Sequence, residues 1–275
     1  MSKTPSMPEV EPLQVGDARL GAAAIPVLLY HSVSASPTGS IAPYTISPAM
    51  FERQLDLIAE RRHALTVTQF AECLNGREAL PANPVVITFD DGFADNLDVA
   101  ARLLADRDLA ATVYVTTGYV GRPSMLAWEQ LRELEDMKLE IGAHAHTHTP
   151  LDELDLAEAV EEISSSKEML ERQLRHPVAT FAYPHGYSSH RVRTAVRSAG
   201  FSSACGVRNA FSHAADDPLN IARLTVRSDV GLERISQWLN GQGAPVVRHG
   251  EALQTRGWRV VRRIRSTRFQ GPGSR

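Results

Sequence analysis

The chain has 275 residues, of which 43% are hydrophobic and 22% charged, a composition that suits one or two compact globular domains and excludes extensive disorder. Its net charge of −3 gives no general case for a nucleic-acid partner, and we expect none. The two cysteines, Cys73 and Cys205, lie far apart in the sequence, which excludes a disulfide scaffold and a cysteine-rich zinc module.

The first 24 residues are rich in proline and small side chains and show no sustained periodicity. We interpret residues 1–24 as a flexible N-terminal arm, followed by a catalytic barrel over residues 25–240. No apolar run has the length of a signal peptide or of a membrane span, so we expect a cytoplasmic protein.

From residue 27 onward, short apolar runs alternate with segments of helical periodicity. Ser47 is a good N-cap and is followed by Pro48 at the first helical position, so a helix should begin there. Gly200 stands where a left-handed C-cap would end another helix. The predicted strands cover 27–30, 84–89, 111–116, 139–142, 178–183, 201–205 and 221–226, and the other predicted helices cover 97–104, 128–134, 156–174 and 191–199.

Continuous apolar strands separated by helices are typical of a parallel α/β architecture, in which both faces of the sheet are covered. The residues with reactive side chains stand just after the predicted strands, as His31, Asp90, His144 and His185 do. A barrel brings the C-terminal ends of all its strands to one rim, whereas an open sheet would disperse several of them. The sequence therefore favours a barrel.

Asp90 and Asp91 are adjacent carboxylates at the end of a strand that we expect to be buried. Two such charges side by side are costly unless a cation or hydrogen-bond donors offset them. Because successive side chains point in different directions, one carboxylate can bind a cation while the other faces an attacking water. The alternative is an Asp-Asp-Gly turn that caps the next helix.

Three histidines follow the strand that ends near residue 142: His144, His146 and His148. Imidazole is a common neutral ligand of zinc, and two histidines four positions apart can converge on one ion if the segment forms a turn. His144 and His148 have that spacing, so His146 should point elsewhere. The alternative is a loop of solvent-exposed histidines.

Together, Asp91, His144 and His148 would give a divalent ion three protein ligands and leave positions open, which is typical of a catalytic metal site. Two imidazoles and one carboxylate suit Zn²⁺ best, although cobalt, nickel or manganese would also fit. Asp90, beside the ion, could take a proton from the water molecule as that water attacks the substrate. This chemistry is the hydrolysis of an amide or ester without a covalent intermediate.

Four motifs carry a resemblance to a known family. They are Tyr-His-Ser at 30–32, Thr-Phe-Asp-Asp-Gly at 88–92, Glu-Ile-Gly-x-His-x-x-x-His at 140–148 and Phe-Ala-Tyr-Pro-x-Gly at 181–186. In this order and spacing, over roughly residues 25–226, the chain closely resembles the polysaccharide deacetylases, also known as carbohydrate esterase family 4 or nodulation-type de-N-acetylases. The Tyr-His and Ala-Tyr-Pro motifs look most like the branch that includes poly-N-acetylglucosamine deacetylases.

The resemblance implies a distorted (β/α)7 barrel and metal-dependent removal of N-acetyl groups from amino sugars in chitin-like, peptidoglycan or exopolysaccharide chains. By position it implies Asp90 as the general base and Asp91, His144 and His148 as the metal ligands. It also implies that the backbone N–H of His185 donates to the oxyanion.

The chain departs from the family pattern at two places. Many members have an arginine that braces the base where this chain has Ala182. The late Leu-x-x-His motif, whose histidine serves as the general acid in the family, is missing from this chain. We expect Arg223, on the last predicted strand, to hold Asp90 or the departing acetate. His31 and then His185 are the candidates for the general acid, each against a purely structural role.

Further residues are candidates for substrate binding. Trp128 could stack on a sugar face, although its helical spacing with neighbouring leucines favours core packing. Tyr183 could donate a hydrogen bond near the metal, and Pro184 follows it in the same motif. We interpret Glu140 and Glu162 as solvated charges.

Residues 241–275 form a basic C-terminal tail. From residue 246 onward it contains eight arginines and a single acidic residue, Glu251. Between residues 256 and 269, apolar and arginine residues alternate roughly as in an amphipathic helix. Such a segment can lie on an anionic membrane surface, and the alternative is a solubilising or disordered tail.

The sequence thus predicts a carbohydrate deacetylase that acts on an acetylated amino sugar, and a cytoplasmic location favours a nucleotide-linked, lipid-linked or short oligosaccharide precursor. Two alternatives stay open. One is a metal-dependent hydrolase of a cyclic amide on a similar barrel. The other is a sugar-binding protein that has lost activity, suggested by the missing arginine and histidine.

Overall fold

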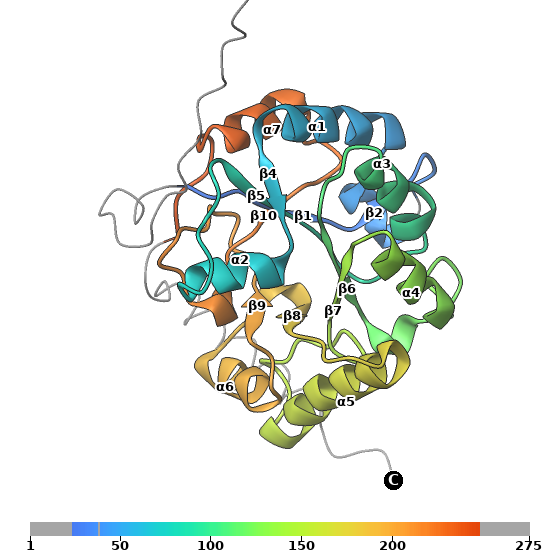
Figure 1. Cartoon of the computed structure of the whole chain (residues 1–275). Helices are drawn as coiled ribbons and strands as arrows, with labels where there is room; N and C mark the ends of the chain where they lie inside the picture. The colour runs from blue at the N-terminus through green and yellow to red at the C-terminus, as the bar shows by residue number, and fades with distance from the viewer. Residues whose placement is uncertain (1–23, 38, 248–275) are drawn as a thin grey trace, which may run out of the picture.

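The computed structural model describes residues 24–37 and 39–247 (Figure 1). The predictions for the N-terminal arm and for the basic tail beyond residue 247 lie outside the described residues. Within the described ranges, no helix is both long and apolar enough to cross a membrane.

A parallel sheet of eight strands forms the centre of the fold, in the order β10-β1-β5-β6-β7-β8-β9, with β4 beside β5. An isolated parallel bridge joins Cys205, at the end of β9, to Ile221, shortly before β10, so the two ends of the sheet curl toward each other. The strands are β1 Val27–Tyr30, β4 His63–Leu65, β5 Pro84–Phe89, β6 Thr112–Val115, β7 Glu140–Ala143, β8 Thr180–Ala182, β9 Ser203–Cys205 and β10 Leu224–Thr225.

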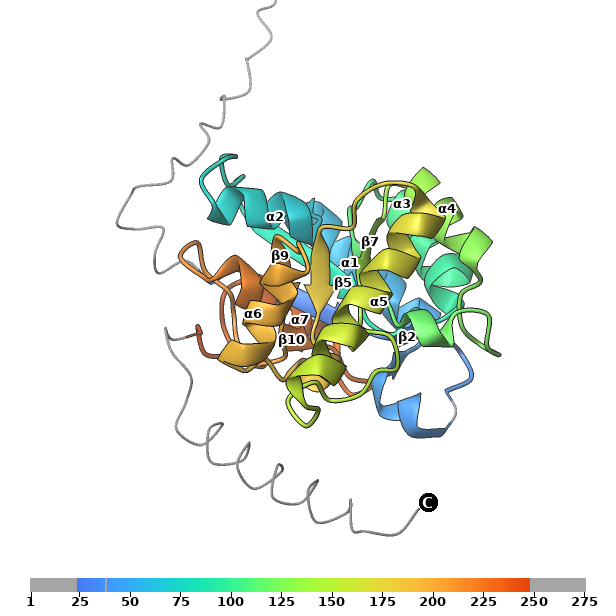
Figure 2. The same cartoon turned by 90° about the horizontal axis from the view of Figure 1, so that it is seen from below.

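Helices surround this sheet, with α1 packed beside α7 and α5 beside α6 (Figures 1 and 2). The helices are α1 Pro48–Arg61, α2 Val67–Leu74, α3 Arg102–Ala105, α4 Trp128–Asp136, α5 Leu156–Leu174, α6 His190–Ser198 and α7 Leu232–Leu239. Short 3-10 segments are η2 Gly39–Tyr44, η4 Thr117–Tyr119, η5 Pro184–Gly186 and η6 Pro218–Asn220, and β2 Ser32–Val33 pairs with β3 Thr45–Ile46. The predicted alternation of strands and helices around a curled parallel sheet is confirmed.

Local sequence explains where several helices begin and end. The Ser47 hydroxyl accepts a hydrogen bond from the Met50 amide, and Pro48 occupies the first position of α1, as predicted. Gly200 follows α6 with a φ of +90°, a conformation that favours glycine.

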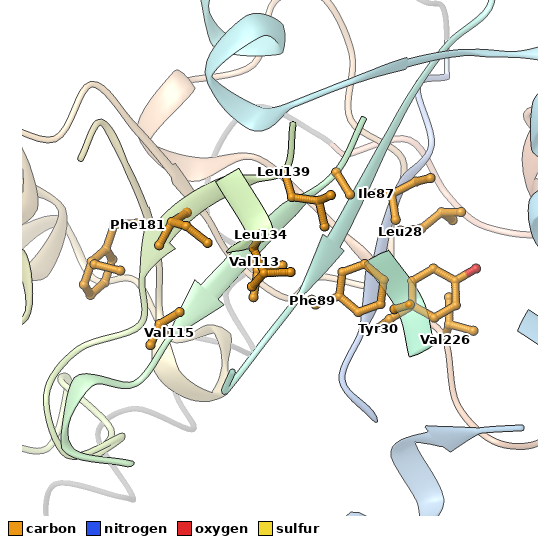
Figure 3. Packing of buried hydrophobic residues seen from close by; sticks show 14 of the residues in the cluster. Leu28, Tyr30, Ile87, Phe89, Val113, Val115, Leu134, Leu139, Phe181 and Val226 are labelled. Atoms are coloured by element: carbon orange, nitrogen blue, oxygen red, sulfur yellow. The ribbon is translucent and has the colours of Figure 1, made fainter. Parts of the chain in front are cut away.

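The core lies between the sheet and the helices, where side chains of neighbouring strands pack together (Figure 3). Tyr30 of β1 contacts both Phe51 of α1 and Phe89 of β5, with ring centroids 5.2 and 5.6 Å apart. All residues of β5 after Pro84 are buried, which explains its continuous apolar sequence. This packing fixes the C-terminal ends of the strands, where the polar residues begin.

One predicted element differs in the structure, and three helices or strands were not predicted. The helix expected over 97–104 is a π-helix at Asn96–Ala101 that continues into α3, and β4 with α2 and α7 were not predicted. β4 has only three residues with mixed burial, so it lacks the apolar run that marks the central strands. α2 has a capping box at Thr66 and Gln69, a pattern that could have identified it.

Gly142 of β7 offers a test of this packing. A Cβ at this position would lie 2.5 Å from two ring carbons of Tyr114. The ring is fixed because its hydroxyl is within hydrogen-bond distance of Thr180 and Cys205. We predict that Gly142→Ala lowers the free energy of unfolding by about 1–3 kcal/mol, measured by urea denaturation.

Gly231→Ala is the matched control, because a Cβ there meets no atom within 4 Å. It should cost less than about 1 kcal/mol. Equal losses for the two variants would contradict the described packing of β7 against Tyr114.

Candidate active site

A cavity of about 510 Å³ opens at the C-terminal ends of the strands. Titratable side chains that follow three of the strands line its wall: His31 follows β1, Asp90 and Asp91 follow β5, and His144 follows β7. His148 lines the same cavity. The parallel fold therefore brings together residues that are more than one hundred positions apart in the sequence, as the barrel prediction required.

Asp91, His144 and His148 form a group that could hold a metal ion. One ligand atom from each residue lies within 4.8 Å of the other two. The Asp91 Oδ1 atom is 3.5 Å from His144 Nε2 and 3.2 Å from His148 Nε2. Two imidazole nitrogens and one carboxylate oxygen thus converge on one point, which leaves further coordination positions for water and substrate.

Several features of these three side chains fit a divalent cation. The Asp91 Oδ1 atom is buried and makes no hydrogen bond. The Nδ1–H of His144 donates to the Ala182 carbonyl at 2.8 Å, which turns Nε2 toward the group as a free lone pair. Burial lowers the pKa of His144 to about 3 and so keeps its imidazole neutral, the form that binds metals.

Burial also raises the pKa of Asp91 to about 6, and the neighbouring Asp90 adds to this rise while His31 opposes it. The neighbouring protein groups alone therefore balance the negative charge of this carboxylate poorly. A cation at the group would supply the missing compensation.

The backbone of the two ligand loops is strained. Asp91, Ala145 and His148 have φ values of 76°, 60° and 65°, and His185 has a φ of 57°. Such left-handed conformations cost side-chain-bearing residues about 1–2 kcal/mol each and persist where the surrounding structure enforces them. The segment between His144 and His148 is a bend, and it brings both rings close to Asp91.

Asp90 is held by Arg223, which is fully buried and immediately precedes β10. The Nη1 and Nη2 groups of Arg223 donate to the two carboxylate oxygens at 2.6 and 2.8 Å, and its Nε–H donates to the Gly206 carbonyl. Burial alone would raise the pKa of Asp90, but Arg223 and then His144 lower it to about 2. Of the two partners proposed for Arg223 from the sequence, the structure pairs it with Asp90.

Both candidates for the general acid line the cavity. His31 packs its ring 5.1 Å from Tyr44, its Nδ1 atom is buried without a hydrogen-bond partner, and burial lowers its pKa. The ring of His185, on η5, lies 4.7 Å from that of His148. Each of them is near enough to the ligand group to meet a substrate bound there.

Three residues named as substrate-binding candidates lie away from the cavity wall. The Tyr183 hydroxyl donates to the Leu219 carbonyl in the core, so it does not donate near the metal group as proposed. Pro184 is buried. It is the first residue of η5, a position that its fixed φ suits. Trp128 begins α4 and packs against the core, the alternative that its helical spacing favoured.

The prediction of a solvated charge is wrong for Glu140. Glu140 accepts hydrogen bonds from the Thr112 hydroxyl and the Thr68 amide, and burial raises its pKa. Glu162 is partly exposed and contacts the loop that carries His144 and His148.

Glu162 of α5 holds the loop between His144 and His148. Its Oε2 atom accepts hydrogen bonds from the amides of His146 and Thr147 at 3.0 and 2.7 Å, and its Oε1 atom accepts one from the Thr147 hydroxyl. On another side of the loop, the Gly118 amide donates to the His146 carbonyl, where a Cβ at 118 would lie 2.5 Å from the oxygen. Reasoning from the sequence missed both contacts.

His146 points away from the ligand group, as predicted. Its Nδ1 atom lies 2.9 Å from the Thr117 hydroxyl oxygen, next to Gly118. The middle histidine therefore helps to anchor the loop to η4 and leaves His144 and His148 as the pair that faces Asp91.

The structure is a curled parallel α/β sheet with a group of three residues that could hold a metal ion at the C-terminal ends of its strands. Comparison with known sequences agrees, because residues 77–204 match the pattern of the polysaccharide deacetylase family. The matched segment covers just under half of this chain, and over residues 77–204 the chain is similar to a polysaccharide deacetylase domain.

Two curated relatives illustrate the likeness. YxkH of Bacillus subtilis, whose name describes a polysaccharide deacetylase, is 23% identical over 65% of this chain, and the match spans 63% of the length of that relative. The poly-beta-1,6-N-acetyl-D-glucosamine N-deacetylase of Staphylococcus aureus is 22% identical over 74% of this chain and 75% of its own length.

Two solved structures share the fold. The deacetylase PplD of Streptococcus pyogenes, in complex with acetate, superposes with a TM-score of 0.73 at 23% identity and covers 79% of this chain and 98% of its own. IcaB of Ammonifex degensii gives a TM-score of 0.70 at 26% identity over 78% of this chain and 97% of its own. The expected barrel of the family is thereby confirmed.

The role of Glu162 in positioning the ligand loop can be measured directly. We predict that Glu162→Ala weakens the binding of Zn²⁺ about tenfold to a hundredfold, the usual effect of losing a group that orients metal ligands. Competition with a chelator measures this change. In metal-free protein, amide hydrogen exchange of residues 144–148 should become faster.

Glu161→Ala is the matched control, because Glu161 is exposed and bonds only to Ser165 among the contacts described. Glu162→Gln should largely restore the wild-type values, since an amide keeps one acceptor and adds a donor for the Thr147 hydroxyl. Identical metal affinity and exchange in Glu162→Ala and Glu161→Ala would rule out the role.

Proposed function

We propose that this protein is a metal-dependent hydrolase that removes N-acetyl groups from an oligosaccharide or polysaccharide containing amino sugars, or from its precursor. One observation carries the proposal: the Asp90 carboxylate, which is not part of the three-residue ligand group, lies beside that group in an open cavity and is kept ionised and oriented by Arg223. The names of the relatives support the same substrate class.

Asp90 is the proposed general base. Its low pKa keeps the carboxylate ionised at physiological pH, and its Oδ2 atom lies 3.7 Å from His144 Nε2, at the edge of the ligand group. A divalent ion held by Asp91, His144 and His148 would polarise the acyl oxygen and lower the pKa of water. Asp90 takes the proton of the water whose oxygen attacks the acetyl carbon.

The reaction is completed when the carbon–nitrogen bond breaks and the amine takes up a proton. His31 is the first choice to donate that proton, because it lines the cavity next to the aspartates, and His185 is the second. The backbone N–H of His185 is the proposed oxyanion donor. Acetate and a free amino sugar are the products.

Zinc is the proposed metal, since two imidazoles and one carboxylate suit it. The alternatives raised by the sequence find less support. A protein without activity would have no need to keep an ionised base beside an intact ligand group, and no feature of the cavity favours a cyclic amide.

Two variants separate metal binding from catalysis. We predict that Asp90→Asn keeps the Zn²⁺ content of the wild type but lowers the rate of acetate release at least about a hundredfold, because the base is lost. Asp91→Asn should lose most of the metal. Metal analysis of the purified proteins and acetate release from N-acetylglucosamine oligomers measure these effects.

Undiminished acetate release by Asp90→Asn would exclude Asp90 as the base. Release from cyclic amides but not from acetylated sugars would replace the proposed substrate class.

We also propose that the basic segment at residues 248–275 binds anionic membranes, so that a cytoplasmic enzyme would work at the membrane surface. The seven-residue excess of arginine over acid in this region supports an electrostatic contact of this kind.

Removal of residues 250–275 should abolish co-sedimentation with vesicles that contain phosphatidylserine and leave acetate release from soluble oligomers unchanged. The full chain should not bind vesicles of phosphatidylcholine alone. Binding of the shortened protein to the anionic vesicles would contradict the proposal.

A further inference from the structure

Arg227 places a positive charge on the wall of the candidate active site. It follows β10 by two residues and lines the same cavity as Asp90 and the metal-binding group. Its side chain is 48% exposed, so the guanidinium reaches solvent while bordering the cavity. The reasoning from sequence gave this residue no role.

The position of this charge is well defined. The guanidinium carbon lies 5.2 Å from the centre of the Tyr44 ring, which also lines the cavity. The next residue, Ser228, donates its amide to the Pro43 carbonyl at 2.9 Å and so joins the two segments. A cation stacked on an aromatic ring keeps its N–H groups available at the edge of the stack.

The charges around Arg227 leave it largely uncompensated. Its ion pair with Asp229 is 3.8 Å long, and the Asp229 side chain is 79% exposed, so solvent screens the pair. Asp90 is neutralised by Arg223. A divalent cation would more than offset Asp91 and leave one positive charge at the ligand group. Among the cavity-lining residues that the structure describes, Arg227 adds a second positive charge, at the solvent-exposed edge of the cavity.

We propose that Arg227 sets the charge preference of the substrate cavity. This inference rests on the proposed function. A sugar next to the acetylated one is favoured when it bears a carboxylate or phosphate and disfavoured when it bears an ammonium group. Because an amino sugar freed of its acetyl group is protonated at neutral pH, each reaction lowers the reactivity of the neighbouring sugars. The enzyme would then leave free amines spaced apart along the chain.

Coulomb's law gives the expected size of the effect. Unit charges about 6 Å apart, at an effective dielectric constant between about 20 and 80, change a binding constant between about threefold and a hundredfold. We expect about a tenfold difference in kcat/KM for each charged neighbour, and a smaller one in 0.5 M salt.

The test compares three probes with the full-length, zinc-loaded protein: a β-1,6-linked N-acetylglucosamine tetramer, the same tetramer with one inner sugar already deacetylated, and the tetramer with a phosphate on its reducing end. The wild type should prefer the phosphorylated probe and disfavour the amine. Arg227→Lys should keep this order of kcat/KM values. Arg227→Gln should make the three values nearly equal, and Arg227→Glu should reverse the order.

Arg77→Gln serves as the control, because Arg77 is exposed at the end of α2 and pairs with Glu72 away from the cavity. Acetate release with the wild-type order of probes in Arg227→Gln and Arg227→Glu would overturn the charge preference alone. A wild-type protein that releases no acetate from any probe would overturn the proposed function and this inference with it.

Discussion

The buried ion pair between Asp90 and Arg223 is the interaction on which the site depends. Both side chains are almost fully buried, and such a pair seldom adds net stability, because the loss of hydration offsets the attraction. The ion pair instead keeps the Asp90 carboxylate ionised and fixes its orientation. Arg223 is itself hydrogen-bonded to the Gly206 carbonyl and the Thr88 hydroxyl, so the barrel interior holds the Asp90 carboxylate in place.

The two neighbouring aspartates have opposite electrostatic environments because each faces a different part of the barrel. Asp90 faces Arg223 and has a depressed pKa, whereas burial without an internal cation raises the pKa of Asp91. The pair can therefore divide proton transfer and metal binding between two adjacent carboxylates. The strained backbone at Asp91 is what allows the two side chains to point to different partners.

Much of this site could be predicted from the sequence, because Asp91, His144 and His148 follow strand ends that a parallel barrel brings together. Arg223 was predicted because it lies on the last strand expected from the sequence. Glu162 and Arg227 were not, since their roles depend on which loop each side chain meets, and isolated charges carry no pattern. The short strand β4 was missed because three residues of mixed burial give no periodicity. The motifs therefore identified the candidate ligands, whereas the residues that contact their loops could be identified only from the fold.

X-ray absorption spectroscopy of the zinc-loaded protein tests the central claim most directly, because it reports the atoms bound to the ion. We predict two imidazole nitrogens together with oxygen ligands near 2.0 Å, roughly the usual distance for zinc. This set should be retained when Asp90 is replaced and lose one imidazole when His148 is replaced. A zinc spectrum with sulfur ligands, or with fewer than two imidazoles in the wild type, would contradict it.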